Sequence, residues 1–471
     1  MRRKRFETTK TCLLLFIAVL AGPRGFAAEP SAALEIAPVA SAPIADGFTI
    51  AAVGDLIYLR PMLATIEKQS PRMLQVLRDA DVAFGNLETS VLDVARFKGA
   101  PQAESGGTWM IADPAVVSDI SRMGFDIVSH ANNHTNDWGP EGLFETIERL
   151  DAAGVVHAGT GRTLAGARAP RYFDAAIGRI GLVAASSTFK PAARAGDPFG
   201  EVPGRPGVNG LRTQRVGFVS EDDLAVIARL AQTKAGAPVR FEGIVFRAER
   251  DSGPGLKIGY EINATDASAN LLALRQGKQN SNFAVFSLHS HEPGNLSETP
   301  ADFAVALARK AIDEGADIFI GHGPHQLRGV EIYKGKPIFY SLGNFAMMNN
   351  SLDLVPPDMY EQNGIEPGSV TAPEFLQAST AVRFADARFY ESVIAVSRYV
   401  GGAIAEIRLY PLDLGHLATG AARGVPKLAD ADTGRRILER MKRLSAALGT
   451  RVSIENGLGV IRISASAKGA E

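Results

Sequence analysis

The loop that decides the predicted fold is Ser129–Asp137, which reads Ser-His-Ala-Asn-Asn-His-Thr-Asn-Asp. The residues before it, Met123–Val128, contain a short apolar run that is typical of a buried β-strand. After the loop, Pro140–Ala153 places apolar residues at helical spacing with acidic residues between them. The polar loop is therefore predicted to follow the carboxyl end of a strand, which is where open α/β sheets bind their ligands.

The Asn and His side chains of this loop support two interpretations. An amide oxygen and an imidazole nitrogen can bind a metal ion or contact a phosphate. Asn is also common in loops for purely structural reasons, because it tolerates the left-handed conformation and caps helices. The loop alone leaves both interpretations open.

The alternation of strand and helix continues along the chain. Apolar runs predict strands at Phe48–Val53, Asp81–Phe84, Val155–Ala158, Ile180–Ala185, Phe283–Leu288 and Asp317–Ile320. Helical spacing predicts helices at Arg60–Ala80, Ala112–Met123, Ala267–Gln276, Pro300–Glu314 and 428–448. The alternation indicates a layered α/β core.

Two regions depart from this alternation. Within an insertion at about residues 190–279, Val239–Phe246 and Leu256–Ile262 flank a Gly-rich turn and predict a β-hairpin. Later in the chain, Val393–Val400 and Ile404–Tyr410 alternate between apolar and polar residues and are predicted to be edge strands.

Residues 1–28 are predicted to be a secretory signal peptide. A basic start precedes the apolar run Leu13–Ala21, and small residues precede Glu29. The apolar run is about half the length of a membrane-spanning helix. A retained amino-terminal anchor is the alternative, because Arg24 lies close to the cleavage site. Residues 29–46 are rich in Ala and Pro and are predicted to be a flexible linker.

The composition excludes several classes of function. Cys12 is the only cysteine and lies within the predicted signal peptide, so disulfides, thiol catalysis and Cys-ligated zinc are excluded from the mature chain. Removing residues 1–28 leaves 44 basic and 50 acidic residues, a net charge of −6. No basic patch with interleaved aromatic residues is present, so no nucleic-acid partner is predicted. We expect a periplasmic or extracellular protein.

Polar clusters follow five of the predicted strands. They are Gly54-Asp55, Gly85–Glu88, Asn132–His134, His289–Glu292 and Gly321–His325. Five of the eight histidines lie in these clusters, and a sixth, His130, lies in the same loop as Asn132–His134. Asp, Glu, Asn and several His without Cys form the ligand set of one or two divalent ions such as Mn, Zn or Fe. Such ions assist displacement at phosphorus, but the same side chains would also serve hydrolysis of an amide or an ester.

Some of these residues also have simpler explanations. Asp55 could cap the next helix, and Glu88 could be an acidic residue that interacts with a helix dipole. His289 directly follows an apolar strand, which favours a functional role over a structural one. His322 and His325 form the strongest pair, because the Gly-Pro turn between them places both rings on one side.

The ordered motifs resemble those of a known family. They are Gly-Asp (54–55), Gly-Asn-Leu-Glu (85–88), Asn-Asn-His-Thr-Asn-Asp (132–137), the strand before His289, Gly-His-x-x-His (321–325) and Tyr-Ser-Leu-Gly-Asn-Phe (340–345). The set resembles the CapA-type capsule biosynthesis proteins, the poly-gamma-glutamate synthesis family, whose domain is similar to calcineurin-like metallophosphoesterases. The likeness covers about two thirds of the chain. It implies a four-layer α/β/β/α sandwich over residues 47–411, followed by a helix and strand extension at 412–471.

The resemblance also implies roles for particular residues. The implied metal ligands are Asp55, Glu88, Asn133, His289, His322 and His325. His134 with Asn133 is the implied catalytic pair, and Asn86, His291 and Asn344 are the candidate substrate-binding residues. The phosphoesterase pattern begins Asp-x-His, whereas Asp55 is followed by Leu56-Ile57. The number of bound ions, one or two, therefore remains open.

Two functions are compatible with these observations. The first is a secreted, metal-dependent hydrolase of phosphoester or amide bonds in a cell-envelope or capsular polymer. The alternative is a non-enzymatic accessory protein for the synthesis or export of an anionic polymer such as poly-gamma-glutamate, held in a membrane synthase complex.

Overall fold

The computed structural model describes residues 39–102, 107–249 and 255–463. The predicted signal peptide and most of the predicted linker lie outside these residues. Within them, no helix combines the length and the apolar character that are needed to cross a membrane. A compact unit begins at Ala40.

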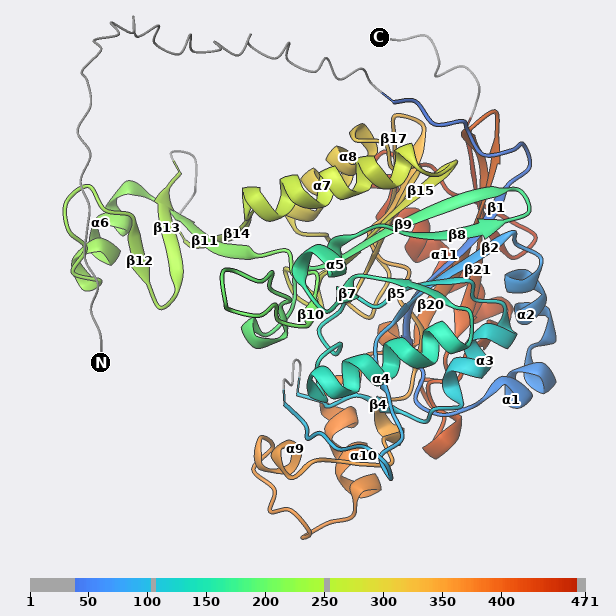
Figure 1. The fold of residues 1–471 in the computed structure, drawn as a ribbon, viewed down its shortest axis with the longest axis horizontal. Coiled ribbons are helices and arrows are strands. Elements are labelled where there is room, and N and C mark those ends of the chain that lie inside the picture. Colours follow the sequence, from blue (N-terminus) through green and yellow to red (C-terminus); the bar gives the residue numbers. More distant parts are fainter. Residues whose placement is uncertain (1–38, 103–106, 250–254, 464–471) are drawn as a thin grey trace, which may run out of the picture. The chain divides into compact units, whose positions relative to one another are not determined.

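Two large sheets form the centre of the molecule (Figure 1). The ten-stranded sheet has the order β23 (Ser453–Glu455), β24 (Leu458–Arg462), β21 (Ala403–Asp413), β20 (Glu391–Val400), β1 (Thr49–Ile57), β2 (Val82–Leu87), β5 (Ile127–Ser129) and β6 (Val156–Ala158), with β19 (Asn344–Met347) beside β1 and β22 (Lys427–Leu428) beside β21. The six-stranded sheet has the order β17 (Val330–Tyr333), β18 (Lys336–Phe339), β16 (Ile318–His322), β15 (Phe283–His289), β9 (Gly178–Ser186) and β8 (Arg171–Ala175).

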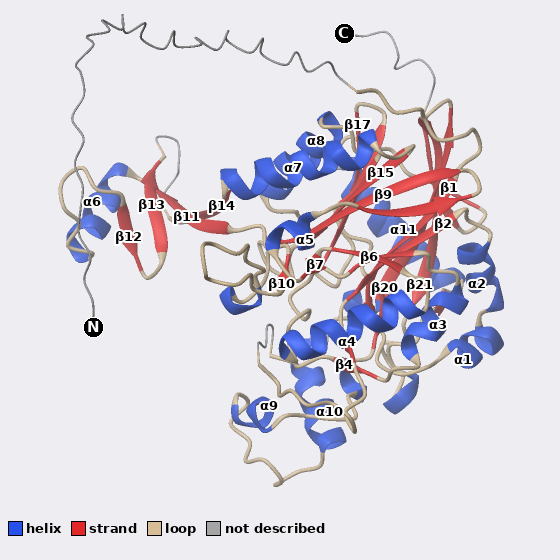
Figure 2. Cartoon of the chain, in the orientation of Figure 1, coloured by secondary structure: helices blue, strands red, loops and turns tan. Residues whose placement is uncertain are grey.

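Helices cover the outer faces of both sheets, as Figure 2 shows. The ten-stranded sheet packs against α1 (Leu63–Gln69), α2 (Pro71–Arg78), α3 (Val116–Met123) and α4 (Gly139–Ala152). The six-stranded sheet packs against α7 (Ala264–Gln279) and α8 (Asp302–Asp313). Between the sheets, Ile50 and Phe84 share one apolar core with Leu182 and Val285. The predicted four-layer α/β/β/α sandwich is confirmed.

The carboxyl-terminal residues are part of this sandwich. β24 pairs with β21 and extends the ten-stranded sheet, and β21 itself runs across residue 411. Helix α11 (Ala431–Ala446) places Ile437 and Met441 in the core between the two sheets. The apolar face of this helix thus closes one end of the sandwich.

Smaller elements decorate the core. A four-stranded sheet contains β12 (Val239–Phe241), β13 (Ile244–Ala248), β11 (Thr213–Val219) and β14 (Lys257–Ile262), with α6 (Glu221–Leu230) beside it. Two further pairs are β10 (Gly207–Val208) with β7 (Thr160–Gly161) and β3 (Ser90–Val91) with β4 (Ile111–Ala112). The remaining α-helices are α5 (Leu164–Arg168), α9 (Pro357–Glu361) and α10 (Ala372–Arg383).

The predicted pairing inside the insertion is wrong. The run Val239–Phe246 folds into a hairpin of its own, β12 with β13, while β14 pairs with β11 instead. Glu242 and Gly243 explain the difference, because both have positive φ values, 47° and 76°. Two such residues form the tight turn whose twist matches a hairpin. An inserted hairpin is present, but it lies a few residues earlier than predicted.

Two other predictions also need correction. The helix predicted at Arg60–Ala80 is two helices, α1 and α2, which meet at Ser70. Pro71 begins the second helix, and proline disfavours a helical conformation in the residue before it. Strands β20 and β21 were predicted to be edge strands but lie inside the sheet, because β1 pairs with β20 and β24 pairs with β21.

Candidate metal centre

The parallel strands of both sheets end at one place and bring their polar side chains together. In the ten-stranded sheet, Asp55 lies opposite Asn86 on β2 and Asn344 on β19. In the six-stranded sheet, His289 at the end of β15 lies opposite His322 at the end of β16. Because the sheets face each other, these two rows meet between them. The polar side chains singled out in the sequence therefore converge at the carboxyl ends of the strands.

Gly54 shows how closely the chain segments approach here. A Cβ atom at this position would lie 1.8 Å from the carbonyl oxygen of Gly343. The same carbonyl accepts a hydrogen bond of 3.1 Å from the backbone N–H of Asp55. The Gly-Asp motif therefore allows β1 to lie against the segment that leads into β19, and this contact fixes the backbone of Asp55.

Asp55 is fully buried and contacts both sheets. Its Oδ1 accepts a hydrogen bond of 2.8 Å from Asn86, and its Oδ2 accepts one of 3.2 Å from the backbone N–H of Gly323. Nδ1 of His325 lies 3.4 Å from Oδ2, and Nδ1 of His322 lies 3.7 Å from Oδ1. Burial raises the pKa of Asp55, but the two histidines and the hydrogen bonds lower it by more. The net effect lowers the pKa and favours an ionised carboxylate.

Glu88 is also fully buried, yet neither of its carboxylate oxygens has a hydrogen-bond partner among the described residues. Nε2 of His289 lies 3.7 Å from Oε1, and Nδ1 of His325 lies 3.9 Å from Oε2. Burial, and then the nearby carboxylate of Asp55, raise the pKa of Glu88 well above its usual value. A buried carboxylate without partners is costly, and a bound cation would relieve this cost.

His289 connects the two sides of the centre through both nitrogens of its ring. Its Nδ1 lies 3.0 Å from Nδ1 of His322, while its Nε2 lies 2.7 Å from Oδ1 of Asn133 and 3.0 Å from Nε2 of His291. Ligand atoms bound at about 2.0–2.1 Å to one ion are separated by about 3 Å. Burial lowers the pKa of His322 and of His291 to about 4, so both rings are neutral at pH 7. A neutral imidazole is the form that binds a metal.

The loop after β5 supplies His134. Nδ1 of this ring lies 2.6 Å from Oδ2 of Asp137, and its Nε2 lies 4.0 Å from Oε1 of Glu88. The backbone N–H of His134 donates a hydrogen bond of 3.1 Å to the side chain of Asn132. The Asn-rich loop therefore holds His134 beside Glu88 at the rim of the centre.

The arrangement fits a divalent cation. Three overlapping sets of side chains place their donor atoms within 4.8 Å of one another: Asp55 with His289 and His322, Glu88 with His289 and His291, and Asp55 with Glu88 and His325. Carboxylate oxygens and neutral imidazoles are ligands for Mn, Zn and Fe. The unpartnered oxygens of Glu88 are the clearest sign, because the described part of the protein offers them no other partner.

All ten residues singled out in the sequence lie in or beside this centre, but three of them take unexpected places. His291 was predicted to contact substrate, and it belongs to one of the donor sets. Asn86 and Asn344 are fully buried. Oδ1 of Asn344 lies 3.0 Å from Nδ1 of His325. The side-chain amide N–H groups of Asn344 donate hydrogen bonds to the backbone carbonyl groups of His325 and Phe389. We therefore assign both asparagines to positioning of the donors.

Sequence reasoning missed two residues that orient the histidines. Oγ of Ser287 lies 2.7 Å from Nε2 of His322, which fixes the ring orientation. Asp137 does the same for His134. A signal was available for both. Ser287 stands two residues before His289 and so shares its face of the strand, and Asp137 is the acidic residue one turn after His134.

A groove gives access to the otherwise buried donors. The side chain of His291 is 19% exposed and lines a cavity of about 580 Å³. The cavity continues past Glu292 to Arg215 on β11 and Tyr260 on β14. The inserted four-stranded sheet thus contributes one wall of the groove that leads to the centre.

Fold and site together define a four-layer α/β/β/α sandwich with a buried cluster of side chains that could hold a metal ion. The family model described as bacterial capsule synthesis protein PGA_cap matches residues 49–349, which is more than half of the chain. The chain belongs to this family.

Several relatives are similar to the chain. The Sinorhizobium fredii protein y4sH, described as uncharacterized, is 43% identical over 438 residues, which are 89% of this chain and 94% of that protein. The capsule biosynthesis protein CapA of Bacillus anthracis is 24% identical over 63% of this chain and 59% of its own length. A Mycobacterium tuberculosis protein described as a probable polyglutamine synthesis accessory protein is 28% identical over 56% of this chain and 55% of its own length.

Proposed function

We propose that this protein is an exported, metal-dependent hydrolase that cleaves phosphoester or amide bonds in a capsular or other cell-envelope polymer. The observation that carries this proposal is the fully buried Glu88, whose unpartnered oxygens lie among neutral imidazoles at the end of an open groove. The proposed ligands of one or two ions are Asp55, Glu88, Asn133, His289, His291, His322 and His325. Membership of a capsule synthesis family supports the choice of substrate.

The surrounding residues have separate tasks in this proposal. A bound divalent ion would act as a Lewis acid toward the oxygen of the scissile group. Asp137 accepts the Nδ1 proton of His134 and so would orient this ring for proton exchange with the substrate. Ser287 and Asn344 hold the rings of His322 and His325. The groove beside His291 would admit the polymer, and burial of the other donors keeps them from bulk water.

A non-enzymatic role is the second candidate. The phosphoesterase pattern begins Asp-x-His, but here Asp55 is followed by Leu56 and Ile57. The missing histidine weakens the case for two tightly held ions. The Mycobacterium tuberculosis relative is described as an accessory protein of polyglutamine synthesis. In this alternative, the protein would bind an anionic polymer next to a membrane synthase and would not cleave it.

We also propose export to the periplasm or the exterior through residues 1–28, with a retained amino-terminal anchor as the alternative. The test is the mass of the protein recovered from the cell envelope. A chain that begins near Glu29 supports cleavage, a full-length chain in the membrane fraction supports the anchor, and a cytosolic chain contradicts both.

The first experiment measures metal content. Wild-type protein is incubated with Mn, Zn or Fe(II), desalted and analysed by elemental mass spectrometry beside His322→Ala. A matched control is His416→Ala, because His416 is only half-buried and lies outside the donor sets. We expect about one or two equivalents in the wild type and the control, and a loss in His322→Ala. Absence of metal from the folded wild type would contradict the proposed centre.

The second experiment separates the two functions. The metal-loaded protein is incubated with a chromogenic phosphodiester and, separately, with poly-gamma-glutamate. Release of nitrophenol or of new amino groups, lost in His322→Ala and kept in His416→Ala, supports a hydrolase of the corresponding bond. Binding of the polymer without either product would favour the accessory role.

A further inference from the structure

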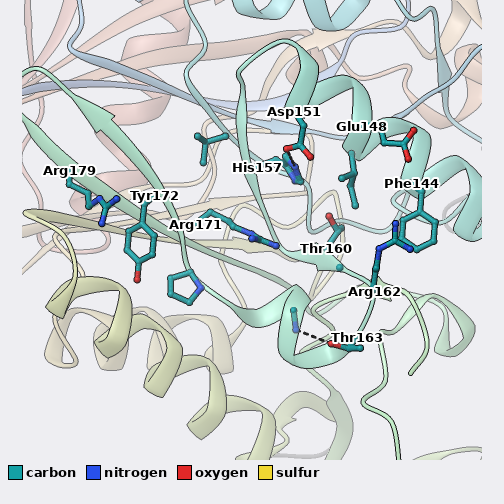
Figure 3. Close-up of a pocket in the computed structure, with 15 residues that line it drawn as sticks. Phe144, Glu148, Asp151, His157, Thr160, Arg162, Thr163, Arg171, Tyr172 and Arg179 are labelled. Carbon is teal, nitrogen blue, oxygen red and sulfur yellow. Dashed lines mark hydrogen bonds and ion pairs between the residues drawn. The ribbon is translucent and has the colours of Figure 1, made fainter. Parts of the chain in front are cut away.

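A second cavity lies at the edge of the sandwich, between α4, β6, β7 and β8 (Figure 3). Its volume is about 820 Å³, within the range of sites that bind small molecules. None of its lining residues belongs to the metal-binding sets. This cavity, which we call the edge pocket, is therefore separate from the proposed active site.

One wall of the edge pocket is cationic. Arg162 and Arg171 form no ion pair with any described carboxylate. The guanidinium of Arg162 stacks on the ring of Phe144 at 4.2 Å, which leaves its N–H edge available. Arg179 also lines the pocket, but Asp174 already pairs with it at 2.7 Å. In Figure 3, the two unpaired guanidinium groups lie on either side of Thr160. This arrangement would suit an oxyanion placed between them.

The opposite wall offers hydrogen-bond acceptors. His157 is only 7% exposed, and its Nδ1 has no hydrogen-bond partner among the described residues. Its Nε2 lies 3.1 Å from Oδ1 of Asp151. Burial lowers the pKa of His157, so the ring is neutral at pH 7, with a proton on Nε2 and a lone pair on Nδ1. Glu148, one helical turn before Asp151, adds a third acceptor along the same wall of α4.

We propose that the edge pocket binds an acidic sugar, either a sugar acid or a sugar phosphate. The carboxylate or phosphate would contact Arg162 and Arg171, and the sugar hydroxyls would donate to Nδ1 of His157 and to the carboxylates on α4. Three acceptors in one pocket call for several donors on the ligand, which a ring of hydroxyls supplies. A sulfate ion has no such donors, and L-glutamate has only its ammonium group.

The pocket also has a link to the loop of the metal centre. Oγ1 of Thr160, which lines the edge pocket, lies 3.2 Å from Nδ1 of His130. The carbonyl of His130 accepts a hydrogen bond of 2.8 Å from Thr135, in the same loop as His134. The sugar proposal does not rest on this link or on hydrolase activity.

The test is calorimetric titration of the full chain with D-glucuronate, D-glucose 6-phosphate, D-glucose and L-glutamate at low salt. We expect at least one acidic sugar to bind about tenfold more tightly than glucose and than L-glutamate. Arg171→Ala should weaken that binding about tenfold or more, because a charge-assisted contact to the oxyanion is lost. Arg179→Ala is the matched control and should change the affinity less than about threefold, because Asp174 occupies that guanidinium.

The outcomes are decisive in either direction. Preference for glucuronate over glucose 6-phosphate identifies a sugar acid, and the reverse identifies a sugar phosphate. The proposal is overturned if neither acidic sugar binds more tightly than glucose or if L-glutamate binds best. It is also overturned if Arg171→Ala and Arg179→Ala weaken the binding of the acidic sugar equally. Metal content and circular dichroism of each variant show that the fold is intact. If Arg171→Ala does not fold, Arg162→Met tests the same cationic wall.

Discussion

Replacing Glu88 with Gln should stabilise the metal-free protein and should reduce the stabilisation that added metal provides. In the metal-free protein, burial and the neighbouring Asp55 oppose the charge of Glu88, and its oxygens have no partners among the described residues. A buried polar group without a partner costs about 1–3 kcal/mol. The amide of glutamine carries no charge and can donate to Asp55. We therefore expect the free energy of unfolding at pH 7, in a chelator, to rise by about 1–3 kcal/mol.

The pH dependence of this gain has a definite sign. The pKa of Glu88 is raised in the folded protein above its value of 4.5 in the unfolded chain. Its favourable contribution is fully present below pH 4.5 and is lost as the pH rises through the folded-state pKa. The variant should therefore match the wild type near pH 4.5 and exceed its stability increasingly above that pH. With metal at a hundred times its Kd, only the wild type gains the full stabilisation of about 2.7 kcal/mol.

The assay is urea unfolding, followed by circular dichroism, at pH 4.5 and pH 7 with chelator and at pH 7 with Mn. A matched control is Glu331→Gln, because Glu331 is buried but accepts hydrogen bonds from Arg309 at 2.9 Å and Tyr340 at 2.6 Å. That substitution should destabilise the protein by about 1–3 kcal/mol, whether or not metal is present. The reasoning is refuted if Glu88→Gln is less stable than the wild type in chelator, or if its gain is the same at both pH values.

Three further predictions concern neighbouring residues. Ser287→Ala removes the partner of His322, so metal affinity should fall about 10–100-fold in competition with a chelating dye, whereas unchanged affinity would contradict this role. Asp137→Asn should reduce turnover about 100-fold while metal content is unchanged, and equal loss of both would mean that Asp137 only supports the fold. Burial lowers the pKa of His130 to about 3, so stability falls as the pH drops from 6.5 toward 3, by about 2 kcal/mol at pH 5. Urea unfolding of His130→Gln at pH 7 and pH 5 should show a smaller fall in the free energy of unfolding than in the wild type. An equal fall in both proteins would contradict the lowered pKa of His130.

The position of the centre could be predicted from sequence because strand ends leave local signals. An apolar run followed by Gly-Asp, Gly-Asn-Leu-Glu or a histidine marks where a buried strand stops and polar chemistry begins. Parallel strands of one sheet end on the same side, so these segments were expected to meet. The structure confirms this for Asp55, Glu88 and His289, which come from three different strands or the residues just after them.

What could not be predicted depends on contacts between distant segments. Nothing in the local pattern of β20 says that its neighbour is β1, about 340 residues earlier in the chain. The burial of Asn344 and its hydrogen bond to the carbonyl of Phe389 could not be predicted for the same reason, because both are tertiary properties. The inserted hairpin was misplaced because the short turn at Glu242 and Gly243 gives a weaker signal than the Gly-rich segment after it.

The neighbours of β1 have a consequence for how the protein is made. One edge of β1, the strand that carries Asp55, pairs with β2, which follows soon in the chain. The other edge pairs with β19 and β20, which are synthesised much later. A nascent chain therefore presents an open, apolar strand edge during most of its synthesis, and such edges invite association with other chains. Long-range pairing of this kind also folds slowly. The nascent protein must therefore be kept from aggregating until β20 has been made and has joined the sheet.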